Sequence, residues 1–470
     1  MAHHFANGIP TRLLMWQRVR EYAVPPSMIE TAAARRAAGD WAGACAAARV
    51  DVDLDLRAVR DRYGTDLAHR LRADLRRLAP DLLRWHMPRI APDGRLRPGL
   101  TLTLARYPGS GATPPHLVVR TPPARADAGQ RMSLALWEGP GNGAPGHHPH
   151  PHPDRRFRLD LHRHLWDGER SSELALRCGA DQAPRVVPDR FDGTDSPWAQ
   201  ARWAAEADLL LRDAGRPRGA FTVRLAARSR AVLELAAPDD SHAPVLRPLH
   251  EALPAQEVAA LPVLPEAAAR ILPDLELLRA GLVPAGRLHP LVAAALPTPR
   301  AAAASTVVAR PGDPHRVECR GEVHRIALRD GTLTAIDHDP DQLRREELLV
   351  ALGGPPLPCL RAIDAVHRSP EALPAVRERL GHGDVTGALA VIEGLLGPGA
   401  VLRDGPLLAA LESAVARRVD HGLFRAGLSH AEHPAADTQA GRRPRLGRHT
   451  PLSARHKRVS RSRPRTTLYP

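Results

Sequence analysis

The sequence predicts an α+β protein in which two helical modules flank a central antiparallel β-rich domain and a disordered basic tail ends the chain. Three observations support this fold class. Apolar residues recur at helical spacing before residue 95 and again after residue 340. Between residues 100 and 236 the apolar period changes to two, which is typical of strands. After residue 430 no apolar periodicity remains, so that segment cannot bury enough surface to fold.

The length of 470 residues allows several domains and a sizeable buried core. Aromatic residues make up only 3%, so Leu, Val and Ala must supply most of the packing. We expect a helical module (1–95), a β-rich domain (96–237), a Pro- and Ala-rich connection (238–304), a β-hairpin patch (305–340), a second helical module (341–429) and a disordered basic tail (430–470).

The first helical module is predicted to contain helices across 27–87. Ser27 and Glu30 follow two prolines with the spacing of a capping box, which marks a helix start. Farther on, leucines recur at helical spacing: Leu67, Leu71, Leu75, Leu78 and Leu82. The opposite face carries His69, Arg70, Arg72, Arg76 and Arg77. We interpret that basic face as solvated, and the alternating Asp51, Asp53 and Asp55 as an exposed edge or a helix entry.

The central domain is predicted to be built from short strands separated by Pro- and Gly-containing turns. The expected strands lie at 100–104, 116–120, 132–137, 157–166, 173–177, 221–225 and 231–235. A helix at 196–212, which contains two tryptophans, is expected between strands.

The connection at 238–304 is predicted to form either short helices broken by prolines or one long covering segment. Asp330-Gly331 is a hairpin turn signal between strands at 323–328 and 332–336. Helices are then expected at 341–352, 359–368, 370–381, 384–396 and 405–427.

Two stretches of the chain share one pattern, an Arg followed by Gly-Asp and then Gly-Ala. Residues 35–44 are RRAAGDWAGA and residues 379–388 are RLGHGDVTGA. Each resembles the turn between the two helices of a tetratricopeptide repeat over about ten residues, but no period of about 34 residues links them. We therefore predict two ordinary αα-hairpins, each with a turn glycine and a capping aspartate.

The net charge of +14 is concentrated in the tail. Lys457 is the single lysine of the chain, and this preference for Arg is typical of a GC-rich genome rather than of nucleic-acid binding. Residues 441–470 nevertheless hold nine Arg and one Lys with no acidic residue. The candidate contacts to nucleic acid or to an acidic partner are Arg455, Lys457, Arg458, Arg461, Arg463 and Arg465.

The sequence contains only partial matches to common catalytic and nucleotide-binding motifs. Residues 141–146 match G-x-G-x-x-G, but the following His-Pro run prevents the helix that a dinucleotide site requires. A Walker A loop needs a lysine, and the single lysine lies in the tail. We therefore expect no cofactor. Cys45, Cys178, Cys319 and Cys359 have no C-x-x-C spacing, so neither a zinc knuckle nor a redox dithiol is predicted.

Two histidine-containing segments are candidate metal ligands. One is the run His147, His148, His150 and His152. The other is Asp160, His162 and His164, which would share one face of the strand predicted at 157–166.

The function expected from these features is that of a cytoplasmic, non-enzymatic interaction or scaffold protein that binds a protein partner of unknown identity, with no membrane span. One alternative is a metal-dependent enzyme that uses the Asp160, His162 and His164 face. The other is non-specific nucleic-acid binding through the Arg-rich tail.

Overall fold

The structure is a computed structural model of the chain. It describes residues 5–6, 9–108, 113–139, 152–180, 197–216, 218–226, 229–236, 245–249, 253–296, 316–319, 321–329, 332–352, 354–355, 357–360, 372–396, 405–428 and 465–467.

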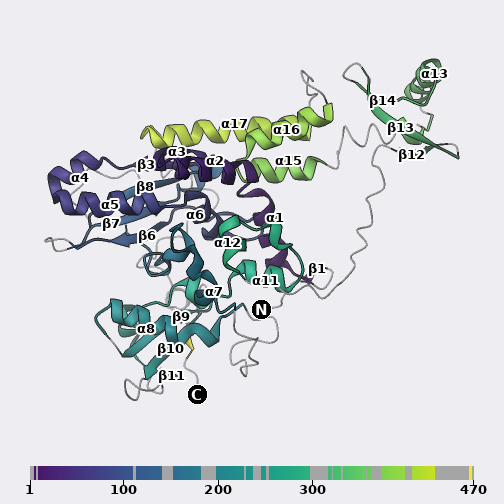
Figure 1. The fold of residues 1–470 in the computed structure, drawn as a ribbon. Helices are drawn as coiled ribbons and strands as arrows, with labels where there is room; N and C mark the ends of the chain where they lie inside the picture. The colour runs from purple at the N-terminus through teal and green to yellow at the C-terminus, as the bar shows by residue number, and fades with distance from the viewer. Residues whose placement is uncertain are drawn as a thin grey trace, which may run out of the picture.

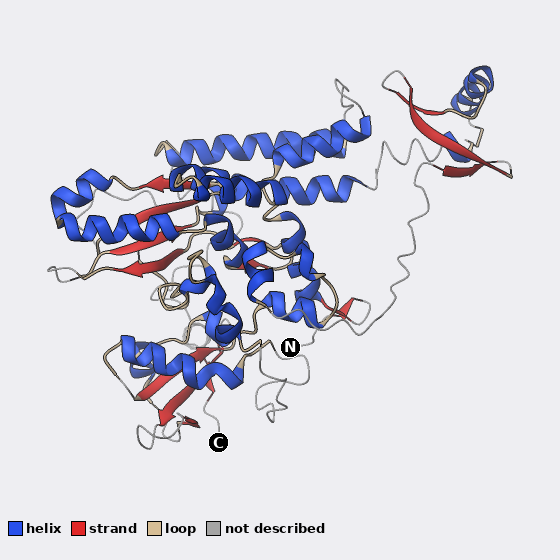
Figure 2. Ribbon diagram, in the orientation of Figure 1, coloured by secondary structure: helices blue, strands red, loops and turns tan. Residues whose placement is uncertain are grey.

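The fold is α+β, with helices towards both ends of the described chain and sheets between them (Figures 1 and 2). After the short pair β1 (Phe5–Ala6) and β2 (Ile9–Pro10), six helices follow: α1 (Thr11–Tyr22), α2 (Pro26–Ala37), α3 (Trp41–Ala47), α4 (Leu56–Tyr63), α5 (Thr65–Arg77) and α6 (Pro80–His86). The predicted capping box is wrong, because α2 already begins at Pro26 and its N-cap residue is Pro25, which makes no side-chain capping bond.

The first sheet has the strand order β3-β8-β7-β6. Its strands are β3 (Val50–Asp53), β6 (Thr101–Arg106), β7 (His116–Arg120) and β8 (Met132–Trp137). β3 is an edge strand parallel to β8, and the other pairs are antiparallel. Leu71 and Leu75 of α5 share the main hydrophobic core with Leu102 and Leu117 of the sheet, as the leucine spacing predicted. The short pair β4 (Arg89–Ile90) and β5 (Arg95–Leu96) precedes β6.

The acidic residues around β3 were predicted to lie at an exposed edge or at a helix entry, and both positions occur. Asp51 and Asp53 lie on the edge strand, and the side chain of Asp55 accepts hydrogen bonds from the first amides of α4. The basic face of α5 is also placed as expected, since His69, Arg70, Arg76 and Arg77 are exposed and Arg72 is half-buried.

The second sheet is centred on β10 (Ser229–Ala236). β9 (Gly219–Arg224) pairs along one side of it, and β11 (Val245–Pro248) and β15 (Arg465–Thr467) pair with its two halves. α8 (Trp203–Asp213) packs on this sheet. It confirms the later part of the helix predicted at 196–212, but a 3₁₀ turn at Gln200–Arg202 precedes it and residues 197–199 are not helical. The three residues of β15 are thus a strand parallel to β10, and the other tail residues lie outside the described part.

The predicted strands at 157–166 and 173–177 are wrong. The first is a run of turns ending in a 3₁₀ turn at Arg163–Leu165, and the second is helical, α7 (Leu174–Cys178). The apolar residues Phe157, Leu159 and Leu165 are buried as an alternating pattern would have them. However, the backbone amides of Leu161, His162 and Leu165 donate to carbonyls three residues earlier, and such bonds close turns instead of a strand ladder. Trp166 Nε1 also donates back to the Leu159 carbonyl at 2.9 Å.

The connection at 253–296 forms short helices, which confirms the first of the two alternatives. They are α9 (Ala255–Ala260), α10 (Glu266–Ala269), α11 (Pro273–Arg279) and α12 (Pro290–Ala295). Each of them has a proline at its N-cap or first position, where the missing amide costs nothing. α11 and α12 add Leu275, Leu277 and Val292 to the main core.

Residues 316–360 include a three-stranded antiparallel sheet and a helix with a small hydrophobic cluster of their own. The strands are β12 (Arg316–Cys319), β13 (Glu322–Arg329) and β14 (Thr332–Ala335), and the helix is α13 (Pro340–Ala351). The pairing of β13 with β14 confirms the predicted hairpin, although its turn at 330–331 lies outside the described residues. The helix expected at 359–368 also lies largely outside them.

The C-terminal helices match the sequence expectation closely. α15 (Ala372–Gly381), α16 (Val385–Leu396) and α17 (Pro406–Arg425) share a cluster that contains Val376, Ala388 and Ala414. α17 also lies on the 3₁₀ turns that precede β8, where His421 Nδ1 is 3.0 Å from the Ala126 carbonyl. No helix in the described part of the chain is long and apolar enough to cross a membrane.

The two repeated sequence patterns form the same local structure. Asp40 and Asp384 each follow a glycine with positive φ, cap the next helix through the amide of Gly43 or Gly387, and bind the arginine five residues earlier. Both are turns of αα-hairpins, which confirms the prediction.

Candidate functional site

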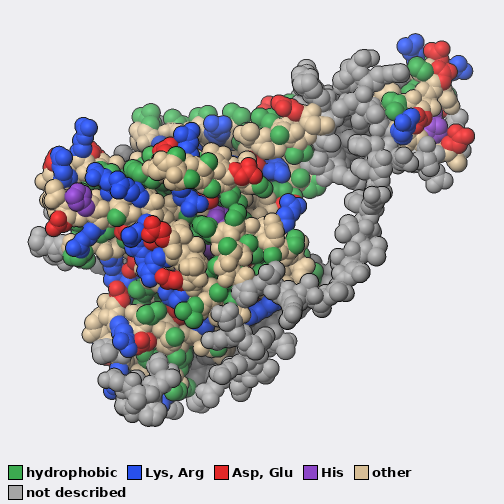
Figure 3. All heavy atoms as spheres, in the orientation of Figure 1, with side chains coloured by type: hydrophobic (Ala, Val, Ile, Leu, Met, Phe, Trp, Pro, Cys, Tyr) green, Lys and Arg blue, Asp and Glu red, His purple; other side chains and the backbone are tan. Residues whose placement is uncertain are grey.

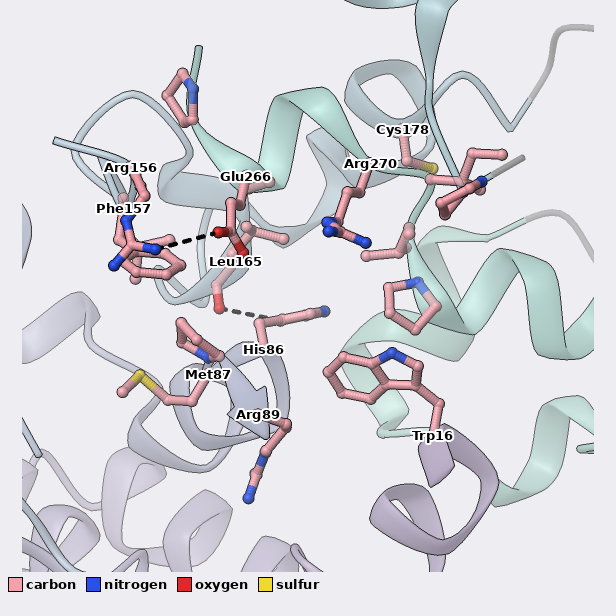
Figure 4. A pocket seen from close by; sticks show the side chains of 18 of the residues that line it. Trp16, His86, Met87, Arg89, Arg156, Phe157, Leu165, Cys178, Glu266 and Arg270 are labelled. Atoms are coloured by element: carbon pink, nitrogen blue, oxygen red, sulfur yellow. Dashed lines mark hydrogen bonds and ion pairs between the residues drawn. The ribbon is translucent and has the colours of Figure 1, made fainter. Parts of the chain in front are cut away.

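The described residues surround a cavity of about 330 Å³ at the junction between the main core and the cluster around the second sheet. Its walls come from α1, the end of α6, β4, the turns at 156–165, α7 and the segment 265–273 (Figure 4). These segments are far apart in the sequence, and folding brings them together around the cavity. Its volume suits a small organic ligand.

Arginine dominates the polar part of the wall. Eight arginines line the cavity: Arg12, Arg20, Arg89, Arg97, Arg156, Arg158, Arg202 and Arg270. Glu266 is the only acidic residue among the described lining residues, and it lies 3.9 Å from Arg156. The cavity wall is therefore strongly cationic unless neighbouring carboxylates behind it neutralise the charge.

Five of the eight arginines are neutralised in this way. Their N–O contacts include Arg12–Glu276 at 2.7 Å, Arg20–Asp274 at 2.7 Å, Arg156–Asp154 at 2.5 Å, Arg158–Asp160 at 2.7 Å and Arg202–Glu206 at 3.0 Å. These pairs hold the wall together, and they leave little positive charge free at those positions.

The other three arginines have no ion pair with any described carboxylate. Arg89 donates to the carbonyls of Arg84 and Gly94, and burial lowers its pKa to about 9. Arg97 has a buried Nε without a hydrogen-bond partner. The guanidinium of Arg270 stands over the Trp198 ring and points into the cavity beside His86 (Figure 4). Burial lowers the pKa of Arg270 as well.

Two histidines add unpaired nitrogens to the same wall. His86 donates from Nδ1 to the Leu165 carbonyl at 3.1 Å, and its Nε2, which has no hydrogen-bond partner, lies 4.0 Å from Asp274 Oδ2. Burial lowers the pKa of His86 to about 4, so its ring is neutral at pH 7. Burial also lowers the pKa of His164, whose Nδ1 has no partner.

The cavity wall also contains Cys178, but its thiol is not activated. Burial raises the pKa of Cys178, and its Sγ donates to the Ala175 carbonyl at 3.5 Å. A nucleophilic cysteine needs a lowered pKa, so the geometry of this wall favours binding over covalent catalysis.

The sequence-predicted metal residues Asp160, His162 and His164 do not lie on one strand face. Asp160 binds Arg158, and His162 Nε2 lies 3.0 Å from Glu206 Oε2. His164 faces the cavity, and its ring meets that of His162 edge-on at 5.8 Å. Their ligand atoms do not form a close group among the described residues, where such a group occurs only at Cys319, His338 and Cys359.

The remaining candidates lie mostly outside the described residues. His147, His148 and His150 are not described, and His152 lies 6.5 Å from the Trp137 ring. Of the tail residues Arg455, Lys457, Arg458, Arg461, Arg463 and Arg465, only Arg465 falls in a described segment, β15.

Sequence reasoning missed the arginine-lined cavity. Its members range from Arg12 to Arg270 and follow no spacing, and the abundance of arginine hides them. Comparisons of the chain with protein-family models, with curated proteins and with solved structures find no match.

Proposed function

We propose that the chain is a binding protein whose arginine-lined cavity takes a compact organic anion, a carboxylate or a phosphate ester. The observation that carries the proposal is that Arg97 and Arg270 line one cavity without an ion pair to any described carboxylate. Glu266 and Glu276 act on Arg270 electrostatically, but neither lies within ion-pair distance of it, and Arg97 is half-buried. An anion bound in the cavity would reach ion-pair distance of both guanidinium groups and stabilise their charge.

The shape of the donor groups supports the same class of ligand. Guanidinium groups bind carboxylate and phosphate oxygens in pairs, with directional bonds. The neutral ring of His86 adds an acceptor nitrogen for a hydroxyl or amide group of the ligand. The apolar side chains of Trp16, Phe157 and Leu165 would contact its carbon skeleton.

Calorimetric titration with inorganic phosphate, citrate, benzoate and the neutral benzamide tests the proposal. We expect at least one anion to bind with a stoichiometry of one and benzamide not to bind. R97Q and R270Q should each weaken that binding about tenfold or more, as expected for the loss of a charge-assisted bond. R70Q is the matched control, because Arg70 is exposed on α5 and away from the cavity lining.

Failure of all the anions to bind, or equal weakening by R70Q and R270Q, would contradict the proposal. The second result would assign the effect to the overall charge of the chain, which acts on any anion regardless of the cavity.

A second candidate function, the predicted binding of a protein partner, is favoured by α17. Val415, Val419 and Leu423 repeat every four residues on this helix and are 61%, 57% and 41% exposed. Figure 3 shows hydrophobic side chains along the edge of the molecule where α17 and α16 lie. An apolar stripe on one helix face is the surface that a partner groove or helix recognises.

Affinity capture with the full chain and with V415S/V419S tests this second candidate. A partner that the full chain retains should be lost from V415S/V419S and kept by E412Q, a polar substitution on the same helix. Identical partners for all three proteins would exclude this face as the docking surface.

A further inference from the structure

Three side chains with soft or borderline metal-ligand atoms converge in the segment 316–360. The sulfur atoms of Cys319 and Cys359 and a ring nitrogen of His338 all lie within 4.8 Å of one another, and all three residues are buried. They are 19 and 21 residues apart in the sequence, so folding alone brings them together. This group is separate from the arginine-lined cavity and from the residues that line it.

The three residues come from three different parts of the segment. Cys319 ends β12 and pairs with Glu322 across a turn in which Gly321 has a φ of 86°. His338 follows β14 in a turn closed by its own amide on the Ala335 carbonyl, directly before the N-cap residue of α13. One ligand thus comes from a strand turn, one from a helix entry, and Cys359 from beyond the helix.

Buried ring nitrogens in this group have no protein partner. His338 Nε2 is buried without a hydrogen bond, and so is Nδ1 of His324, whose ring stacks on that of His338 at a centroid distance of 4.1 Å. A buried polar atom that lacks a hydrogen-bond partner destabilises the fold. A metal ion is a partner that would use the ring nitrogen of His338 together with the two sulfurs.

The two cysteines also take part in the hydrophobic cluster of the segment. Among the side chains that the structure describes there, the buried members are Cys319, Ala335, Leu357 and Cys359, with Leu343 and Leu360 packed against them. A metal ion bound by both cysteines would therefore add to the stability of this cluster.

We propose that Cys319, His338 and Cys359 bind a zinc ion that stabilises the segment 316–360. Two thiolates and one imidazole are ligands that bind zinc well, whereas calcium and magnesium prefer oxygen ligands. The three protein ligands leave the fourth tetrahedral position to a water molecule or a further side chain. Binding converts both thiols to thiolates and releases their protons to solvent.

Elemental analysis of the untagged full chain tests the site. We expect one zinc per chain, lost in C319S, C359S and H338Q. C45S and C178S are matched controls, because they remove the other two buried cysteines and should keep the zinc. H338C restores a ligand of zinc at the same position and should retain the metal, which separates loss of a ligand from loss of the fold.

Cobalt substitution identifies the ligands by spectroscopy. The Co²⁺-loaded full chain should show a sulfur-to-cobalt charge-transfer band that disappears in C319S and C359S and persists in C45S and C178S. The histidine run at 147–152 would bind cobalt without that band, because it offers no sulfur.

Three results would overturn the proposal. The first is that the wild-type protein neither contains zinc nor gives the charge-transfer band. The second is that zinc persists in both C319S and C359S. The third is that Cys319 and Cys359 form a disulfide instead of two thiols. A thiol count on the denatured, chelator-treated chain detects the disulfide as two free thiols in place of four.

Discussion

Arg20 of α1 and Asp274 of α11 form an ion pair that is almost completely removed from water. Their side chains are 2% and 0% exposed, and Arg20 bonds to both carboxylate oxygens of Asp274, at 2.8 and 2.7 Å. Asp274 also accepts from Trp85 Nε1. The pair ties the first helix to the connection that follows the second sheet, about 250 residues later.

Breaking this pair from one side should be costly. We expect R20M to lower the free energy of unfolding by about 3–5 kcal/mol, since it leaves a buried carboxylate without its cation. The double variant R20M/D274N should lose less than the sum of the two single variants, because it removes the uncompensated charge and keeps an acceptor for Trp85. Urea unfolding followed by Trp fluorescence measures all four proteins, and strict additivity would show that the two side chains are not coupled.

Several buried histidines should make the fold sensitive to mild acid. Burial lowers the pKa of His86 to about 4, and burial together with the neighbouring arginines lowers the pKa of His382 to about 3. In the unfolded chain both rings titrate near pH 6.5. The unfolded state therefore binds more protons below that pH, so the stability contributed by these neutral rings is fully present above about pH 6.5 and is lost as the pH falls towards the folded pKa values.

The expected size of this effect is measurable. Between pH 6.5 and pH 5 each buried histidine should cost about 1.6 kcal/mol of stability. The free energy of unfolding should thus fall across this range, and it should fall less steeply in H86Q and H382Q. H69Q is the control, because His69 is exposed on α5 and should leave the slope unchanged. A flat profile for the wild type would contradict the neutral state of the buried rings.

At the scale of elements, the two αα-hairpin turns form a matched pair that differs in burial. Asp40 is an exposed cap bound to Arg35, whereas Asp384 is 5% exposed and binds both Arg379 and Arg49. The second turn therefore holds the C-terminal helices to the residue that precedes β3, in addition to capping its own helix.

We expect the two cap substitutions to differ in cost. D40A should lower the stability of the chain by about 1 kcal/mol, the usual value of a helix cap. D384A should cost about 2–3 kcal/mol, because it also removes the carboxylate that the half-buried guanidinium groups of Arg49 and Arg379 bind. Thermal and urea unfolding of the two variants measure the difference. Equal costs would show that the Arg49 contact adds nothing to the cap.

The turn glycines provide an independent comparison at the same two places. Both Gly39 and Gly383 have positive φ, so alanine is strained at either position. A side chain at Gly39 meets nothing within 4 Å, while one at Gly383 would stand 2.3 Å from the Gly129 carbonyl oxygen. G39A should therefore cost about 1 kcal/mol and G383A clearly more, with exposure of α17 to proteolysis as a second readout. Similar proteolysis of both variants would contradict this close approach.

At the scale of the whole molecule, the charge of the tail should decide non-specific binding to nucleic acid. Residues 441–470 hold ten basic and no acidic residues. We expect the full chain to retain duplex DNA at low salt, with an affinity that falls steeply as salt rises, because binding releases counterions. A 1–440 truncation should lose most of this affinity. It also removes β15, so the free energy of unfolding of both proteins is needed beside the DNA titration. Binding that survives the truncation would point to the exposed arginines of α5 instead.

The sequence by itself determined most of the helices and more than half of the expected strands. Leu67, Leu71 and Leu75 identify the buried face of α5, alternation identifies β6 to β10, and the Gly-Asp turns identify both αα-hairpins. These features are encoded by residues a few positions apart, so a local pattern is enough to find them. The strand prediction for 157–166 was wrong because the backbone there closes a series of turns, which Trp166 and His162 support through side-chain bonds to nearby carbonyls. The apolar alternation is the same in these turns as in a strand, so the sequence pattern does not distinguish the two.

Only the tertiary structure decided which residues form the two candidate sites. Arg97 and Arg270 are 173 residues apart, and Cys319 and Cys359 lack the close spacing by which metal-binding cysteines are recognised. Conversely, Asp160, His162 and His164 are neighbours in sequence but point to different partners, because the chain turns between them. A cavity or a metal site depends on which side chains meet and which of them stay unpaired after packing. That pairing is settled by contacts between distant segments, which the order of residues along the chain does not reveal.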